Sequence, residues 1–312
     1  MRVVSGWARS FGVLSAVTEQ QELEIVNEGF PLISTFYSAC LDEARIDSRG
    51  STPLLPMLAM IAAINDSASL TATLAALWVD GNDALFSFSG SADDEAPNVT
   101  LASFDQGGVS LPLTVYGGND THSFEAQVAM SVFAEALFGL LPAPWNMSAS
   151  NASSNAYAVE AMLANISTSD VARRDPNADY HKLGLDALQN MTKSIDFVAF
   201  LGAVGVDMTT FNRNDTNIVS LEFFGALDSV LSGLSSTMLR DFLAWRYVSA
   251  NAGLLSAPFR NASFAFEQAI NGEPSLPARE VQCVRAIDAT DLGFAVGHQV
   301  RQYNLLLLLF CR

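Results

Sequence analysis

A short acidic segment in the first half of the chain gathers side chains able to bind a metal or transfer protons. It reads Asp120-Thr-His122-Ser-Phe-Glu125, where we expect a strand to give way to a helix. A helix would place His122 and Glu125, three residues apart, on one face beside Asp120. The alternative is structural: Thr121 or Ser123 caps the helix, and the acids favour the positive end of its dipole.

A second acidic group lies in two expected loops and comprises Asp80, Asp83, Asp93, Asp94 and Glu95. Oxygen-rich loops bind calcium, but this spacing matches no calcium-loop motif, including the EF-hand. A solvated acidic turn is the alternative. Paired carboxylates for glycoside hydrolysis stay open as well, because the fold sets the distance between them.

The motifs that mark common enzyme classes are absent from the sequence. There is no Gly-x-Ser-x-Gly nucleophile elbow, no phosphate-binding glycine motif and no His-Glu-x-x-His zinc motif. The three histidines, His122, His181 and His298, are scattered along the chain. We therefore assign no catalytic residue, metal ligand or cofactor. On this basis we expect that the protein is not an enzyme.

Asparagine sequons give the strongest signal in the sequence. Nine of the 18 asparagines begin an Asn-x-Ser/Thr triplet in which x is not proline, where chance predicts about three. We expect N-glycosylation at Asn65, Asn98, Asn119, Asn146, Asn151, Asn165, Asn190, Asn214 and Asn261. The alternative is a Ser- and Asn-rich cytosolic chain with chance matches. Glycosylation predicts a eukaryotic secretory-pathway protein at the cell surface or outside the cell.

The three cysteines and one dibasic pair fit such a compartment. Cys40 and Cys283 are the natural disulfide pair, and two buried free thiols are the alternative. We expect Cys311, near the C-terminus, to stay unpaired. Arg173-Arg174 is a candidate processing site in an exposed loop, or part of a plain polar loop. Trp78, Phe86 and Phe88 line either a carbohydrate-binding face or, by default, the core.

The elements that position these residues follow from hydrophobic periodicity and turn residues. We expect helices near 18–28, 32–45 and 57–64, then four antiparallel strands within about 75–116, joined by turns at Asp80-Gly81 and Gly107-Gly108. An apolar, central helix follows over 123–141, and 143–155 reads as a linker. Helices are expected over 156–166, 180–191, 195–204, 220–231 and 237–248, and a returning strand over 280–287.

This pattern predicts an α+β fold, with a small antiparallel meander packed against a mostly helical remainder. Residues 1–142 would hold helices and strands, and 156–312 mainly helices and one strand. If Cys40 and Cys283 pair, the two parts form one interwoven body.

Both ends of the chain are apolar without spanning a membrane. Arg9 interrupts the apolar run after Met1, so the signal peptide is marginal. Five leucines, Leu305 to Leu309, precede Phe310 near the other end, too few for a span of about 20 residues. We expect this leucine run to tether the protein to a membrane, as part of a longer membrane protein. A buried final strand or helix is the alternative.

Charge excludes some partners. The chain has 312 residues, 16 basic against 33 acidic, and a net charge of −17. An acidic surface repels phosphate backbones, so we expect no nucleic-acid partner, whereas a protein or glycan partner stays open. The sequence therefore predicts a non-catalytic, N-glycosylated ectodomain with a binding or structural role. The alternative is a secreted, carboxylate-dependent hydrolase acting on glycan or peptide.

Overall fold

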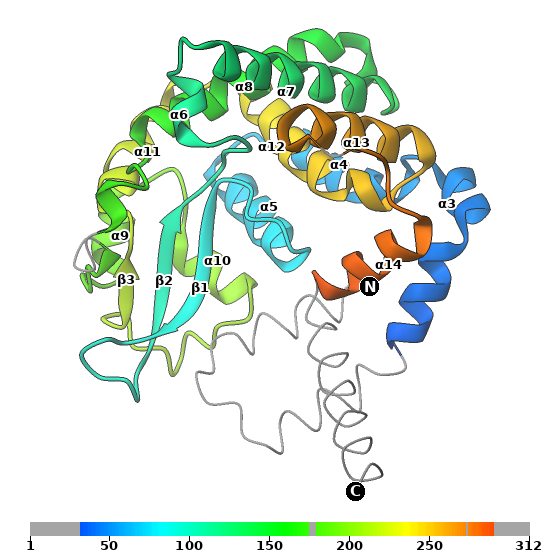
Figure 1. Ribbon diagram of the computed structural model, residues 1–312. Coiled ribbons are helices and arrows are strands. Elements are labelled where there is room, and N and C mark those ends of the chain that lie inside the picture. Colours follow the sequence, from blue (N-terminus) through cyan, green and yellow to red (C-terminus); the bar gives the residue numbers. More distant parts are fainter. Residues whose placement is uncertain (1–31, 175–178, 273, 290–312) are drawn as a thin grey trace, which may run out of the picture.

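Helices surround one small sheet in the computed structural model, which describes residues 32–174, 179–272 and 274–289 (Figure 1). The expected α+β class with a mostly helical remainder is confirmed. The helix expected near 18–28 and the leucine run at 305–309 lie outside the described residues. No helix within the described ranges is both long and apolar enough to cross a membrane.

Two helices replace the one expected over 32–45. Residues 32–41 are helical, the helix breaks at Asp42, and α3 follows over Glu43–Arg49. Asp42 causes the restart, because its carboxylate accepts a hydrogen bond from the Arg45 backbone N–H as the N-cap of α3. A 3₁₀ turn, η1 (Thr52–Leu54), leads into α4 (Leu55–Ala62), close to the helix expected there.

Helix α5 (Ser67–Val79) corrects the first expected strand. Asp66 accepts from the Ser69 N–H at 2.7 Å, and Ser69 Oγ accepts from the Asp66 N–H at 3.1 Å, which forms a capping box. Leu77 and Trp78 were expected in a strand, but with Leu70 and Leu74 they extend one buried helical face. The Asp80-Gly81 turn therefore joins a helix to a strand, with Gly81 at φ 91°.

The sheet has three strands in the order β1–β2–β3. Strands β1 (Phe86–Ala92) and β2 (Thr100–Gln106) are antiparallel, with Phe88 opposite Phe104. Strand β3 (Thr216–Ile218) runs parallel to β2 and comes from far along the chain, so the sheet is mixed. Strand β3 was not predicted from the sequence, because three residues are too few to show alternation.

The fourth expected strand, over 109–116, is absent from the described structure. After β2 the chain leaves the sheet through Gly108, which has φ 81° and lies where a Cβ atom would be 2.7 Å from Leu163 Cδ1. Pro112 then starts the short helix α6 (Leu113–Tyr116). Proline lacks the N–H that a ladder needs, which explains why this apolar run does not pair.

Helix α7 (Thr121–Gly139) forms where the sequence predicts it, but it is not central. It lies at the outer surface beside α8 (Ala149–Ile166), with Phe124 65% and Val132 63% exposed (Figure 1). Helix α8, preceded by η2 (Trp145–Ser148), begins inside the expected linker at 143–155. The division into 1–142 and 156–312 stays a prediction.

The second half supplies the remaining helices. The four expected over 180–248 are present with adjusted ends: α9 (Leu185–Met191), α10 (Phe197–Ala203), α11 (Leu221–Gly233) and α12 (Ser236–Asn251). The short 3₁₀ turns η3 (Ala172–Arg174) and η5 (Ala252–Leu254) lie between helices, and α13 (Ala257–Asn271), which the sequence did not indicate, ends at Gly272 with φ 70°. Phe266 of α13 stacks on Phe133 of α7 at 4.9 Å between ring centroids.

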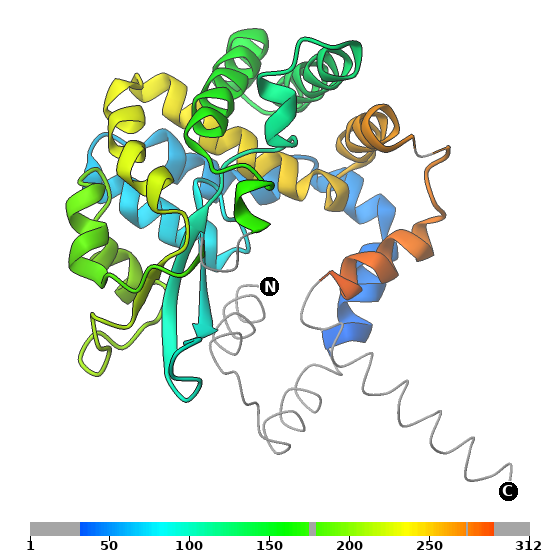
Figure 2. The same cartoon turned by 60° about the vertical axis from the view of Figure 1, so that its left-hand side comes forward.

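The returning strand expected over 280–287 is instead α14 (Arg279–Asp288). Cys283 and Ile287 are its buried residues, and their spacing of four is that of one helical face. Helix α14 lies beside the helical segment 32–41, on the side of the molecule away from the sheet (Figures 1 and 2). The Cys40 and Cys283 Sγ atoms are 2.06 Å apart with disulfide geometry, which joins the helical segment 32–41 to α14.

Phenylalanines fill the space between the sheet and the helices behind it. Phe86 and Phe88 of β1 and Phe104 of β2 contact Phe197 and Phe200 of α10, with ring centroids 5.2–6.3 Å apart. Phe224 of α11 joins them. This cluster belongs to one continuous apolar core that runs from Leu54 to Phe259.

Candidate functional site

The Asp120–Glu125 segment is a helix cap in this structure. Asp120 Oδ1 accepts from the Ser123 backbone N–H at 3.0 Å, and Oδ2 accepts from Ser123 Oγ at 2.6 Å. These two bonds, the hydroxyl first, lower the pKa of Asp120 below its usual value. His122 and Glu125 are exposed. The structural alternative fits, although Asp120 is the cap in place of Thr121 or Ser123.

The acidic loops form an ion-pair anchor around Asp93. The Asp93 carboxylate is buried and accepts from Lys182 Nζ at 2.7 Å and from the Tyr180 hydroxyl at 2.8 Å. The Lys182 hydrogen bond is the main reason that the pKa of Asp93 is lowered to about 2. This anchor ties the β1–β2 hairpin to the chain after η3, while Asp94 and Glu95 are exposed.

A buried carboxylate that sequence reasoning missed lies at Glu160 of α8. Its side chain is completely buried and accepts from the Trp245 indole N–H at 2.6 Å and from the Ser110 N–H and hydroxyl at 2.8 and 2.7 Å. The Tyr116 hydroxyl also donates to it, and Arg246 Nη1 is 3.7 Å away. Burial, then the charge of Glu160, raises the pKa of Tyr116. This cluster joins α6, α8 and α12.

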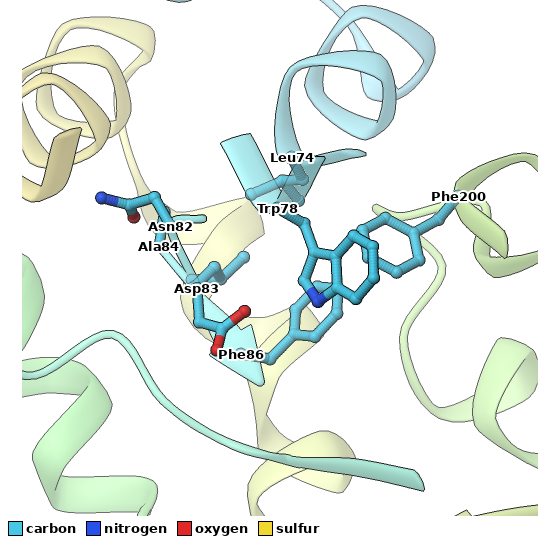
Figure 3. A pocket seen from close by; sticks show the side chains of 8 residues that line it. Leu74, Trp78, Asn82, Asp83, Ala84, Phe86 and Phe200 are labelled. Atoms are coloured by element: carbon cyan, nitrogen blue, oxygen red, sulfur yellow. The ribbon is translucent and has the colours of Figure 1, made fainter. Parts of the chain in front are cut away.

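The aromatic residues considered for carbohydrate binding are core residues. Trp78, Phe86 and Phe88 are at most 6% exposed, and the Trp78 indole N–H donates to the Phe88 carbonyl at 3.0 Å. A pocket beside them, between α5, the start of β1 and Phe200, measures only about 10 Å³ (Figure 3). That is the space of one water molecule, so this pocket holds no substrate.

The dibasic pair lies in η3, and only its first arginine forms ion pairs within the described residues. Arg173 Nη2 donates to Asp105 at 2.7 Å, and Asp179 lies 3.4 Å from Arg173 Nε, whereas Arg174 is exposed. A protease would have to break the Asp105 contact before it could bind Arg173. Processing at this pair stays a prediction.

All nine sequon asparagines are exposed. Six other asparagines lie in the described ranges: Asn82, Asn155, Asn212, Asn217, Asn251 and Asn271. Of these, Asn82 and Asn217 are buried and two more are only partly accessible, so exposure follows the sequon and not asparagine in general. An exposed side chain is a condition for glycan attachment. Glycosylation itself stays a prediction.

The described residues do not fit a metal centre. Across residues 32–174, 179–272 and 274–289 there is no group of three His, Cys, Asp or Glu side chains able to hold an ion. His181 Nδ1 lies 3.1 Å from the Ile218 carbonyl, where it supports β3, and His298 lies outside the described residues.

Comparison with known proteins supplies what this geometry lacks. The chain is 23% identical over 299 residues to endothelin-converting enzyme 1 of Bos taurus, covering 93% of this chain and 39% of that protein. It is 26% identical over 310 residues to endothelin-converting enzyme-like 1 of Rattus norvegicus, covering 88% and 40%. The chain thus spans about two fifths of the length of these relatives.

Solved structures share the fold at low sequence identity. The zinc metalloprotease Zmp1 of Mycobacterium tuberculosis, in its open state, matches with a TM-score of 0.77 at 22% identity, over 96% of this chain and 44% of that one. PepO of Lactobacillus rhamnosis matches with a TM-score of 0.66 at 14% identity, over 95% and 48%. At this identity the likeness concerns the fold alone.

A family model overturns the function expected from the sequence. The model for the N-terminal part of peptidase family M13 matches residues 12–304. The prediction of a non-catalytic ectodomain is wrong, and so is the preference for a protein that is not an enzyme. Both predictions depended on the absence of short catalytic motifs. A family can be recognised from similarity along the whole chain even where no such motif is present. The chain belongs to peptidase family M13.

Proposed function

We propose that this chain is the peptide-binding and enclosing part of a zinc-dependent peptidase, and that it does not itself hold the zinc. The family match over 12–304 carries this proposal. The metal assignment draws on the printed title of Zmp1, a zinc metalloprotease of the same fold.

The residues present explain why the two roles divide. Zinc peptidases commonly hold the metal through a His-Glu-x-x-His helix, in which the glutamate acts as general base. The 312 residues contain no such motif, and the described ranges contain no alternative ligand group. Zinc-holding residues therefore have to come from another segment, in a longer product or in a second chain.

A metal-free part can still contribute to peptide hydrolysis. Peptidases gain rate when the peptide is held in one orientation and bulk water is kept from the reacting bond. The continuous core from Leu54 to Phe259 and the buried Glu160 cluster give this chain the rigidity that such a role needs. In this role the chain would enclose and contact the peptide, while hydrolysis takes place at the zinc held by another segment.

An assay with three samples tests the division. A quenched fluorescent peptide is incubated with this 312-residue chain, with a zinc-bearing M13 segment, and with both together, each with and without 1,10-phenanthroline. We expect hydrolysis that needs both parts and is abolished by the chelator, and less than one zinc per chain in metal analysis of this chain alone. Stoichiometric zinc and hydrolysis by this chain alone would contradict the assigned role, and no hydrolysis in any sample would contradict the peptidase proposal.

We also propose that the protein works in the secretory pathway or at the cell surface. The observation in favour is that nine sequons, three times the chance number, all lie on exposed asparagines. The test of this proposal is the glycosidase experiment described in the Discussion.

A further inference from the structure

A pocket of about 220 Å³ lies between α13 and α14, far from the sheet. The segment that joins the two helices forms part of its wall, and both views show α14 below α13 (Figures 1 and 2). Nine residues line it: Gly253, Arg260, Ser263, Phe264, Glu267, Leu276, Pro277, Gln282 and Arg285. Its size suits a single amino-acid residue or a small acid.

Basic side chains gather at this pocket in an acidic protein. Arg260 and Arg285 line it, and Arg279 lies directly behind Gln282, to which its Nη1 donates at 3.2 Å. The whole chain has 16 basic residues against 33 acidic ones, so two arginines in the pocket wall and a third behind it are unusual for this chain. Arg260 is 8% exposed, which is rare for a charged side chain without full pairing.

The positive charge there is not fully matched. Arg260 Nη1 and Arg279 Nη2 are buried and have no hydrogen-bond partner among the described residues. One carboxylate, Glu43, serves both guanidinium groups, at 2.8 Å from Arg260 Nη2 and 3.8 Å from Arg279 Nε. Two effects lower the pKa of Arg279: burial is the larger, and the nearby charge of Arg260 is the second. Buried donors without acceptors are costly, so an anion would relieve this site.

Two further described acids, Asp47 and Glu267, already accept hydrogen bonds from this chain. Asp47 Oδ1 accepts from the Ala257 N–H at 2.7 Å at the start of α13. Glu267, which lines the pocket, accepts from Asn271 Nδ2 at 2.6 Å. Its negative charge favours a ligand with one negative charge over a dianion such as phosphate.

The pocket also has apolar lining residues. Phe264 of α13 and Pro277 line the pocket, and Leu276 beside them is 41% exposed. Ser263 and Gln282 add neutral polar atoms to the lining. A few placed polar groups in an apolar surround are typical of pockets that bind small ligands.

We propose that the α13–α14 pocket binds a peptide carboxylate that neighbours an apolar side chain. Arg260 and Arg285 receive the charge, and Phe264 and Leu276 contact the apolar group. That the ligand is a peptide depends on the proposed function, whereas the carboxylate chemistry depends only on the pocket. The carboxylate comes from either a chain terminus or an acidic side chain.

Calorimetric titration of the 312-residue chain tests the proposal. The probes are N-acetyl-leucine, its amide, and N-acetyl-Leu-Asp-amide, which separates a terminal from a side-chain carboxylate. We expect saturable binding of at least one acid and at least about tenfold weaker binding of N-acetyl-leucine amide, because a charged hydrogen bond is lost. Equal binding of acids and amide, or inorganic sulfate and phosphate binding as tightly as the acids, would overturn the proposal.

Variants locate the site. Arg285→Gln, at an exposed position, should weaken acid binding about tenfold without affecting folding, and Arg260→Gln should do the same or more. Glu43→Gln removes the competing carboxylate, so it should strengthen binding several-fold, which a purely structural role of Glu43 would not do. The matched control is Arg213→Gln, since Arg213 is 49% exposed and pairs with Asp186 elsewhere. Unchanged affinity in folded Arg285→Gln and Arg260→Gln proteins would contradict the assignment.

The titration tests the pocket independently of the peptidase proposal. The titration uses no hydrolysis, so absence of acid binding rejects the pocket while two-part hydrolysis of peptides still supports the proposed function. Acid binding without any hydrolysis, in contrast, supports the pocket and rejects the peptide as its physiological ligand.

Discussion

Glu160 is the residue on which the packing of α6, α8 and α12 depends most. Its buried carboxylate accepts four hydrogen bonds, and Arg246 is the nearest cation. Glu160→Gln replaces one acceptor oxygen by a donor and removes the charge opposite Arg246. We expect the free energy of unfolding to fall by about 2–4 kcal/mol, measured by urea denaturation.

The control for this prediction is Glu135→Gln. Glu135 is an exposed glutamate on α7, and its replacement should change the free energy of unfolding by less than about 0.5 kcal/mol. Equal stability of the Glu160 and Glu135 variants would show that the buried cluster contributes nothing. Tyr116→Phe should lie between the two, because it removes only one donor to the carboxylate.

Asp93 should make stability depend on pH in the acid range. Its pKa falls from 3.8 to about 2 on folding, mainly through the Lys182 hydrogen bond. A lowered pKa adds stability that is present above about pH 4 and lost as the pH falls through 2. Melting temperatures measured between pH 5 and pH 2 should therefore fall less steeply for Asp93→Asn than for the parent protein.

Asp94→Asn provides the matched comparison, because Asp94 is the exposed neighbour. Its melting temperature should follow the parent curve. A second bond to Asp93, donated by the Tyr180 hydroxyl, acts in the opposite direction: it raises the pKa of Tyr180 to about 12, so its contribution to stability is present below pH 10 and lost as the pH rises through 12. Identical acid profiles for the Asp93 and Asp94 variants would contradict the anchor.

Residue roles of this kind could not be read from the sequence. Glu160 is one of 33 acidic residues, and only the packing of α8 against α12 makes it buried. Asp120 was noticed because a histidine and a glutamate follow it, yet its capping bonds were the correct and more ordinary explanation. The opposite holds for sequons, which are local, so all nine could be placed before the fold was known.

Elements were predictable where the local pattern agreed with the packing. Helix α7 has a clear start and a proline after its end, and four helices of the second half formed as expected. The errors at Leu77–Val79 and at 280–287 share one cause. A short apolar run is compatible with either a strand or a helix. At Leu77–Val79 the helix forms because Leu70 and Leu74, one and two turns earlier, complete its buried face.

The link between residues 32–41 and α14 should depend on the disulfide. Cys40 and Cys283 are 243 residues apart, and cross-linking so long a loop removes about 5 kcal/mol of denatured-state entropy in the chain-entropy model. We expect Cys40→Ala/Cys283→Ala to lower the unfolding free energy by several kcal/mol. Hydrogen exchange should show the largest loss of protection in α14, and not in the sheet.

Reduction of the parent protein is the control that needs no substitution. Mild reductant should reproduce the exchange pattern of the double variant and leave β1 and β2 protected. Free thiols at both Cys40 and Cys283 in protein purified from an oxidising compartment would contradict the pairing.

At the scale of the whole molecule, the predicted N-glycans would explain how so apolar a chain keeps a hydrophilic surface. Half of the residues are hydrophobic, 16% are charged, and only two of the 16 basic residues are lysines. Hydrophilic glycans on nine exposed asparagines would supply surface solvation that charged side chains supply elsewhere. With glycans attached, the −17 charge would be a property of the protein surface and would need no basic partner to explain it.

This view predicts the behaviour of the protein made in a eukaryotic secretory host. Its intact mass should exceed that of the polypeptide, and an N-glycosidase should return it to the polypeptide mass while lowering its solubility. Single Asn→Gln variants at the nine sequons should each remove one glycan, whereas Asn212→Gln and Asn271→Gln, at exposed asparagines outside sequons, should remove none. A secreted product with the bare polypeptide mass would contradict both the glycosylation and the solvation argument, because the exposed sequons would then be unused and the low surface charge would need another explanation.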